Sequence, residues 1–285
     1  MGRQRQNPYQ SVAVPLDSTQ DRRFVAALAR GLEVLRSFTP RDQWLPHHEL
    51  ARRTGLAPAT VSRLTFTLTQ LGYLLHRPAT GEYAISPAVL ALGFSALSNF
   101  DLARIARPWM DDLAEATQSA VSLGVRHGTT MVYVAHCRST ARLSLGLDVG
   151  TRLPLAETAM GRAWWCSASE PWRERVAQLL AAERPERWSS RQSRLRQMQD
   201  QMARRGYVTS EGEWESDIAA IGAGIDLGDG REPLALTVGG PASRLQGALL
   251  HDTFGPLLVQ TCAAIADAVR SGQWRTPGTA RGPGY

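Results

Sequence analysis

The stretch Leu50–Val61, LARRTGLAPATV, decides the fold of the first third of this chain. Two helices that cross at a tight turn need a small residue at the crossing, a glycine in the turn and a buried branched residue early in the second helix. Ala51, Gly55 and Val61 supply these residues in that order. The stretch therefore predicts a helix-turn-helix, the motif that places its second, recognition helix in the major groove of DNA.

Apolar periodicity predicts the elements around this motif. A first helix is expected at residues 24–38, and the recognition helix runs from the favourable first-turn proline Pro58 to about Gly72. Residues 74–85 predict two short strands around a turn, and Ser86 begins a connecting helix that ends near residue 97. This order of elements is that of a winged helix-turn-helix followed by a linker helix.

The recognition helix presents one face to DNA, and its apolar stripe fixes which face that is. We expect Val61, Leu64, Leu68 and Leu71 to point into the core. The first turns of the opposite face then reach base edges and phosphates. The predicted DNA contacts are Ala59, Thr60, Ser62 and Arg63 on this helix and Arg77 on the hairpin.

Arginine recognises guanine through two hydrogen bonds, to O6 and N7, so Arg63 is the expected base contact. The alternative for Arg63 is a surface salt bridge. Arg77 lies on the hairpin that runs along the DNA backbone and is expected to contact a phosphate. Phe66 shares the outward face, and we expect it to pack under the wing rather than to touch a thymine methyl group.

Charge supports a DNA partner and excludes some chemistry. The net charge is +6, and all 32 basic residues are arginine, which excludes Schiff-base lysines and a P-loop lysine. Residues 1–100 hold 11 Arg and 6 acidic residues, a net of +5, whereas residues 101–285 hold 21 and 20, a net of +1. The excess positive charge is therefore in the predicted DNA-binding region.

The chain is expected to be soluble and cytoplasmic. Cys137, Cys166 and Cys262 have no paired spacing, which favours a reducing compartment and argues against disulfides or a thiolate metal site. The polar N-terminus does not resemble a secretory signal, and the longest apolar stretch, residues 247–269, contains charged residues. We expect no membrane partner, no metal and no cofactor.

The second half predicts one α/β domain with a largely antiparallel sheet. The expected strands are residues 120–126, 131–136, 142–147, 218–225 and 233–238. The expected helices are one from Asp101 that Pro108 interrupts, one from Thr158, a charged region ending at Arg205, and residues 253–269. Trp164 and Trp165 are expected in the core rather than in a pocket wall.

Motifs that occur in a fixed order run through both halves of the chain. In the first third these are residues 24–35, FVAALARGLEVL, the helix-turn-helix, and residues 71–74, LGYL. In the second half they are residues 149–154, 158–163, Arg205-Gly206-Tyr207 followed by Glu213, and residues 237–241. Together these motifs resemble those of IclR-family transcriptional regulators. Two segments, Arg30-Gly31-Leu32 in the first predicted helix and Met160-Gly161-Arg162, are similar to the sequences of one IclR subgroup. That subgroup controls aromatic-acid catabolism and has protocatechuate-type effectors.

The resemblance implies a GAF-like effector domain whose ligand lies between the sheet and the helix opened by Thr158. Its pocket positions fall on Ala159, Met160, Ser210, Ala220, Thr237 and Gly239. The N–H groups of Thr158–Gly161 and the positive helix end favour a carboxylate, which adds Thr158 and Gly161 to the expected site. The alternative for Thr158 is a helix cap alone, and both roles can coexist. Ala220 and Gly239 leave room for a bulky, aromatic acid.

The expected organisation is α+β. It comprises a flexible arm (1–21), a winged helix-turn-helix (22–86), a linker helix (87–100), an effector-binding domain (101–271) and a disordered tail (272–285). The expected function is a DNA-binding transcriptional regulator controlled by a small organic acid. The expected assembly is a homodimer or a dimer of dimers, because one recognition helix covers only a few base pairs.

Two other classes of function remain as alternatives. An enzyme is disfavoured because the glycines from Gly222 to Gly228 lack dinucleotide-loop spacing, and because His136 and Cys137 point to opposite faces of a strand. The second alternative is a small-molecule sensor that acts through protein contacts without binding DNA.

Overall fold

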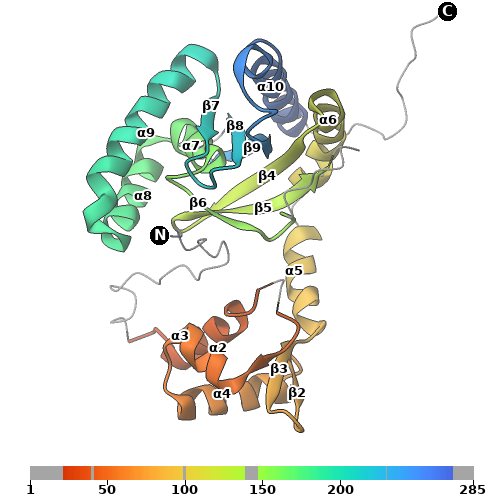
Figure 1. Ribbon diagram of the computed structural model, residues 1–285, viewed down its shortest axis with the longest axis vertical. Helices are drawn as coiled ribbons and strands as arrows, with labels where there is room; N and C mark the ends of the chain where they lie inside the picture. The colour runs from red at the N-terminus through yellow and green to blue at the C-terminus, as the bar shows by residue number, and fades with distance from the viewer. Residues whose placement is uncertain (1–21, 40–41, 99–100, 139–146, 229, 272–285) are drawn as a thin grey trace, which may run out of the picture. The chain divides into compact units, whose positions relative to one another are not determined.

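The computed structural model describes residues 22–39, 42–98, 101–138, 147–228 and 230–271, and divides into two compact units, residues 1–99 and 100–285 (Figure 1). Each unit is described by itself. Among the described residues, no helix combines the length and apolar character needed to cross a membrane.

The N-terminal unit is a winged helix-turn-helix, as predicted. Its elements are α2 (Ala26–Arg36), β1 (Leu45–Pro46), α3 (His47–Thr54), α4 (Pro58–Gln70), β2 (Leu74–Arg77), β3 (Glu82–Ile85) and α5 (Ala88–Ser98). The strands form an antiparallel sheet in the order β1-β3-β2. The two-residue strand β1 was not expected, because its partner β3 lies some forty residues away in the sequence.

The turn between α3 and α4 forms for the reason that the sequence indicates. Gly55 adopts a φ of +67° and donates its N–H to Ala51 O at 2.9 Å, which ends α3. Leu50 and Val61 are fully buried across this turn. One expectation for α4 is wrong: Leu71 is 62% exposed, and Thr65 is fully buried in the core with its hydroxyl donating to Val61 O.

The C-terminal unit is an α/β domain around one antiparallel sheet in the order β6-β5-β4-β9-β8-β7. Its strands are β4 (Ala120–His127), β5 (Thr130–Cys137), β6 (Arg152–Pro154), β7 (Val208–Glu211), β8 (Ile218–Ile225) and β9 (Leu234–Pro241). Its helices are α6 (Asp101–Thr117), α7 (Ala159–Ser167), α8 (Glu170–Glu183), α9 (Pro185–Arg205), the π-helix η1 (Leu249–Phe254) and α10 (Gly255–Ser271).

The secondary structure of this unit differs from the prediction at α6, β6 and β7. Helix α6 continues through Pro108, which was expected to interrupt it. Strands β6 and β7 were not expected as strands. The predicted strand at residues 142–147 lies almost entirely outside the described residues.

Helices cover both faces of the sheet. Helices α6 and α10 contribute to one core, and α7, α8 and α9 to the other (Figure 1). Trp164 is fully buried and Trp165 nearly so, which confirms the prediction that both are core residues. Helix α7 lies close against β8, because a Cβ atom on Gly222 would be only 2.6 Å from Ala159 O. This close approach places the amino end of α7 directly over the sheet.

Candidate functional site

The outward face of α4 carries the predicted DNA contacts. Ala59, Ser62 and Arg63 are exposed, and Thr60 is half-buried in the first turn. Within the described residues, Arg63 makes no ion pair. Its guanidinium is therefore available to an external acceptor.

Phe66 also lies on this outward face. Its side chain is 65% exposed, so the expectation that it packs under the wing is wrong. Phe66 follows Ser62 by four residues and Arg63 by three. Residues at this spacing share a face of a helix, so Phe66 lies one turn beyond them on the same face.

The wing holds Arg77 at the end of β2. The Arg77 guanidinium lies 4.0 Å from the centroid of the Trp44 ring and 3.4 Å from a carboxylate oxygen of Glu82. The side chain of Arg77 is nevertheless 46% exposed. Stacking on Trp44 restricts the position of this cation while leaving it accessible from solvent.

By contrast, the arginines of α3 are paired within the unit. Arg53 bonds both Asp42 and Glu49, and Arg52 bonds Glu49. Hydrogen bonding from Arg53 lowers the pKa of Asp42 to about 2, and hydrogen bonding from Arg52 and Arg53 lowers the pKa of Glu49 to about 2. These charges hold α3 to the preceding loop.

A row of small residues crosses four strands of the larger sheet. Ser210 of β7 pairs with Ala220 of β8, which pairs with Gly239 of β9. Gly239 in turn pairs with Ala120 of β4. Because none of these side chains is larger than serine, the row forms the floor of a cavity beneath α7.

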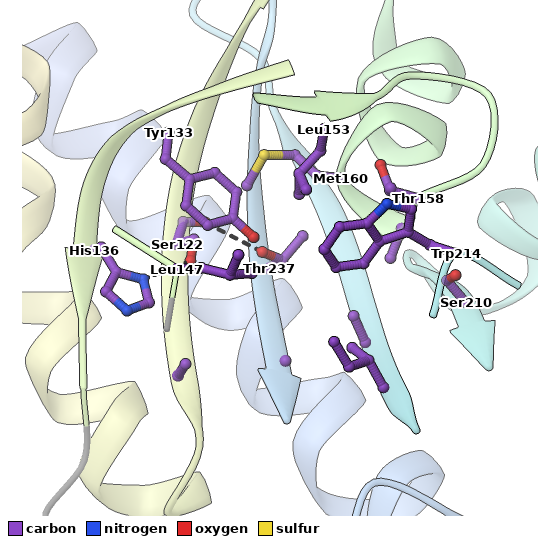
Figure 2. A pocket seen from close by; sticks show the side chains of 15 residues that line it. Ser122, Tyr133, His136, Leu147, Leu153, Thr158, Met160, Ser210, Trp214 and Thr237 are labelled. Carbon is purple, nitrogen blue, oxygen red and sulfur yellow. Dashed lines mark hydrogen bonds between the residues drawn. The ribbon is translucent and has the colours of Figure 1, made fainter. Parts of the chain in front are cut away.

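A polar row runs beside this floor. Ser122 of β4 pairs with Thr237 on one side and with His136 of β5 on the other. Two residues along β4, Gly124 pairs with Tyr133, because β5 contains a bulge at that point. The extra residue puts Tyr133 and His136 on one face, although strict alternation would separate them. Figure 2 shows both side chains at the cavity.

The polar row supplies neutral hydrogen-bonding groups. Ser122 Oγ lies 2.9 Å from His136 Nδ1, and Thr237 Oγ1 donates to Ser122 O at 3.4 Å. Burial lowers the pKa of His136, so its imidazole is uncharged at neutral pH. Burial also raises the pKa of Tyr133, which outweighs the effect of the neighbouring Ser122 and Thr237 hydroxyls and keeps the phenol protonated.

Thr158 caps the helix that covers the cavity. Its hydroxyl donates to Pro154 O at 2.8 Å and accepts the N–H of Gly161 at 3.3 Å. Gly161 itself packs against the backbone of Leu155, where an added Cβ would be 2.1 Å from Leu155 O. Thr158 lines the cavity and also caps the helix, whereas Gly161 is not among the lining residues.

Ala159 and Met160, the first two residues of α7, line the cavity. First-turn N–H groups have no intrahelical partner, and they lie at the positive end of the helix dipole. This end of α7 therefore offers the cavity a site that favours an anion.

Two aromatic side chains stand on opposite sides of the cavity, Tyr133 from β5 and Trp214 from the loop after β7 (Figure 2). The loop is held from behind by Glu213, which bonds both the buried Arg162 of α7 and Arg194 of α9. Arg162 is 3% exposed and also donates to Ala156 O and Thr209 O. The position of the Trp214 wall is thus coupled to α7.

The empty space between the lining residues, together with open solvent at its mouth, is about 530 Å³. The cavity brings together most of the predicted effector residues, namely Thr158, Ala159, Met160, Ser210, Ala220, Thr237 and Gly239. Sequence reasoning did not assign Ser122, Tyr133, His136 or Trp214 to the effector site. The pairing of Ser122 with His136 could not be predicted, because it depends on the register between β4 and β5.

Two family profiles match this chain. "IclR helix-turn-helix domain" matches residues 27–78, and "Bacterial transcriptional regulator IclR C-terminal" matches residues 94–267. The chain belongs to the IclR family. It is 30% identical over 243 residues to the Pca regulon regulatory protein of Pseudomonas putida, which covers 85% of this chain and 83% of the relative.

Two solved structures share the fold of this IclR-family regulator. An IclR family transcriptional regulator from Brucella abortus is 34% identical with a TM-score of 0.75, covering 92% of this chain and 98% of that chain. An IclR homolog from Microbacterium hydrocarbonoxydans, solved in complex with 4-hydroxybenzoate, is 20% identical with a TM-score of 0.68, covering 86% and 99%. At that identity the second likeness is one of fold.

The family assigns the two units to transcription regulation. The N-terminal unit is a DNA-binding helix-turn-helix and the C-terminal unit an effector-binding domain. The matched families and relatives are transcriptional regulators, and so is this chain. Across the described residues, no three potential metal ligands lie together.

Proposed function

We propose that this regulator binds an operator through α4 and the wing, and that an aromatic carboxylic acid in the cavity of the C-terminal unit controls this binding. The observation that carries the proposal is the composition of the cavity. It combines the amino end of α7, apolar walls and neutral hydrogen-bonding groups.

The proposed pose follows from this composition. The carboxylate accepts the N–H groups of Ala159 and Met160 at the positive helix end. The ring lies between Tyr133 and Trp214, and Thr237 faces a polar substituent. The relative solved with 4-hydroxybenzoate supports this ligand class.

On the DNA side, Ala59, Thr60, Ser62 and Arg63 contact the major groove, and Arg77 contacts a phosphate. One recognition helix covers too few base pairs for useful specificity, so we propose a homodimer or a dimer of dimers on paired half-sites. Because the target is chromosomal DNA, we place the regulator in the cytoplasm.

Calorimetry on the full chain tests the effector. We expect binding of 4-hydroxybenzoate or another benzoate-type acid and none of the matching amide or methyl ester. Met160→Glu should abolish binding by placing a negative charge beside the carboxylate, whereas the apolar control Met160→Leu should retain it. Both variants should keep operator affinity and a cooperative melting transition.

Two results would contradict this proposal. One is a ligand panel in which only neutral compounds bind, and the other is a ligand located away from residues 158–161. Separately, a gel-shift assay on the upstream promoter region tests DNA binding. A regulator that acts only through protein contacts would shift no fragment.

A further inference from the structure

We propose that Phe66 contacts the methyl group of a thymine in the operator, beside the base pair that Arg63 contacts. This inference rests on the proposed operator binding. It concerns a residue of the recognition helix that the sequence alone predicted to pack under the wing.

The position of Phe66 carries the argument. A single exposed apolar side chain is ordinary on a protein surface. Phe66, however, is 65% exposed in the middle of α4, on the face that also presents Ser62, Arg63 and Gln70. Its neighbours on this face are polar, so no apolar cluster within the described unit includes it.

The chemistry of the major groove supplies one apolar feature, the C5-methyl group of thymine, and phenylalanine is among the side chains that contact it. Thymine also presents a polar acceptor, O4, so its methyl group is the feature that a phenyl ring can distinguish. A recognition helix with a phenyl group in this position therefore favours thymine, because only thymine adds an apolar contact.

The spacing between the two side chains places the thymine. Three residues advance a helix by about 4.5 Å, and successive base pairs are about 3.4 Å apart. Phe66 therefore meets a base about one or two pairs from the guanine that Arg63 contacts. The half-site should contain a guanine and a thymine at this separation.

The test begins with selection from a random DNA pool by the full-length wild type. We expect a thymine at a fixed distance from a guanine in each half-site. Phe66→Ala should lose the thymine preference and keep the guanine, and Phe66→Leu should keep part of it. Leu71→Ala is the matched control, because Leu71 is 62% exposed but lies at the C-cap of α4, away from the face that carries Phe66.

Deoxyuridine in place of that thymidine removes only the methyl group. This replacement should weaken wild-type binding by about four-fold, because one buried carbon is lost from the interface. The affinity of Phe66→Ala should be the same for both DNAs. Equal losses in both proteins, or an unchanged selected motif for Phe66→Ala, would overturn the inference. A wild type that enriches no sequence would instead overturn operator binding itself.

Discussion

Helices α4 and α7 each present their first turns to a proposed ligand, yet their surroundings are opposite. The outward face of α4 is exposed, and its N-cap residue Ala57 makes no side-chain hydrogen bond. Helix α7 is buried along most of its length, and Thr158 caps it. A helix that meets a polymer must be accessible from outside, whereas one that holds a small molecule can be part of the core.

One arginine on each helix shows the same contrast. Arg63 on α4 is exposed and makes no ion pair with the described residues, while Arg162 on α7 is 3% exposed and bonds Glu213. Burial lowers the pKa of Arg162 to about 10. The second arginine holds α7 to the loop after β7, whereas the first is the one that we propose for DNA binding.

Removal of the Glu213 charge should have the largest effect on this contrast. Glu213→Gln removes the carboxylate that bonds the buried Arg162, and the C-terminal unit should lose about 3 kcal/mol of unfolding free energy. Urea unfolding followed by tryptophan fluorescence measures the loss. The control is Asp267→Asn, which breaks an exposed ion pair and should cost less than about 1 kcal/mol. Equal losses for the two variants would show that burial does not determine how much an ion pair contributes to the free energy of unfolding.

Arg63→Ala should leave stability unchanged and weaken specific DNA binding by about 1–3 kcal/mol, the contribution of a two-pronged base contact. Gel-shift titrations at fixed salt measure the ratio of the affinity for operator DNA to the affinity for random DNA. Arg52→Ala provides a matched control, because Arg52 is exposed but bonded to Glu49. If Arg63→Ala keeps full operator affinity, Arg63 does not contact a base.

The smallest expected effect is the acid sensitivity that Asp42 and Glu49 give to the helix-turn-helix unit. The pKa values of Asp42 and Glu49, about 2 in the folded unit, lie below the ordinary values of 3.8 and 4.5. Their ionisation therefore stabilises the fold above about pH 4.5, and this contribution, about 1 kcal/mol for a partly buried network at the surface, is lost as the pH falls toward 2. Melting temperatures at several pH values, for wild type and Asp42→Asn/Glu49→Gln, measure it. A double variant with the wild-type acid sensitivity would refute it.

The two units differ in how much of each was predictable from sequence. The helix-turn-helix is built from local contacts, so Ala51, Gly55 and Val61 predicted it directly. Phe66 was misplaced, because periodicity gives the direction of a side chain but not whether another element covers it. In the larger domain, α7 and the floor residues Ala220 and Gly239 followed from the family resemblance.

The rest of the cavity could not be predicted from local pattern. Strict alternation separates Tyr133 from His136, and only the bulge in β5 unites them. Trp214 enters from a loop whose position depends on Glu213 and its partners. The short strands β6 and β7 have no clear pattern of their own in the sequence. They form because they pair with β5 and β8 at the two edges of the sheet.

The pairing of Ser122 with Thr237 has a consequence for how this protein is made. These residues are 115 positions apart, and their strands adjoin at the centre of the sheet. Pairing of such distant segments is slow, because the intervening chain must first be ordered. A nascent chain thus lacks a complete cavity until β9 has been synthesised. An effector that binds only the finished cavity will favour the folded domain by mass action, so its supply should raise the amount of intact regulator in the cell.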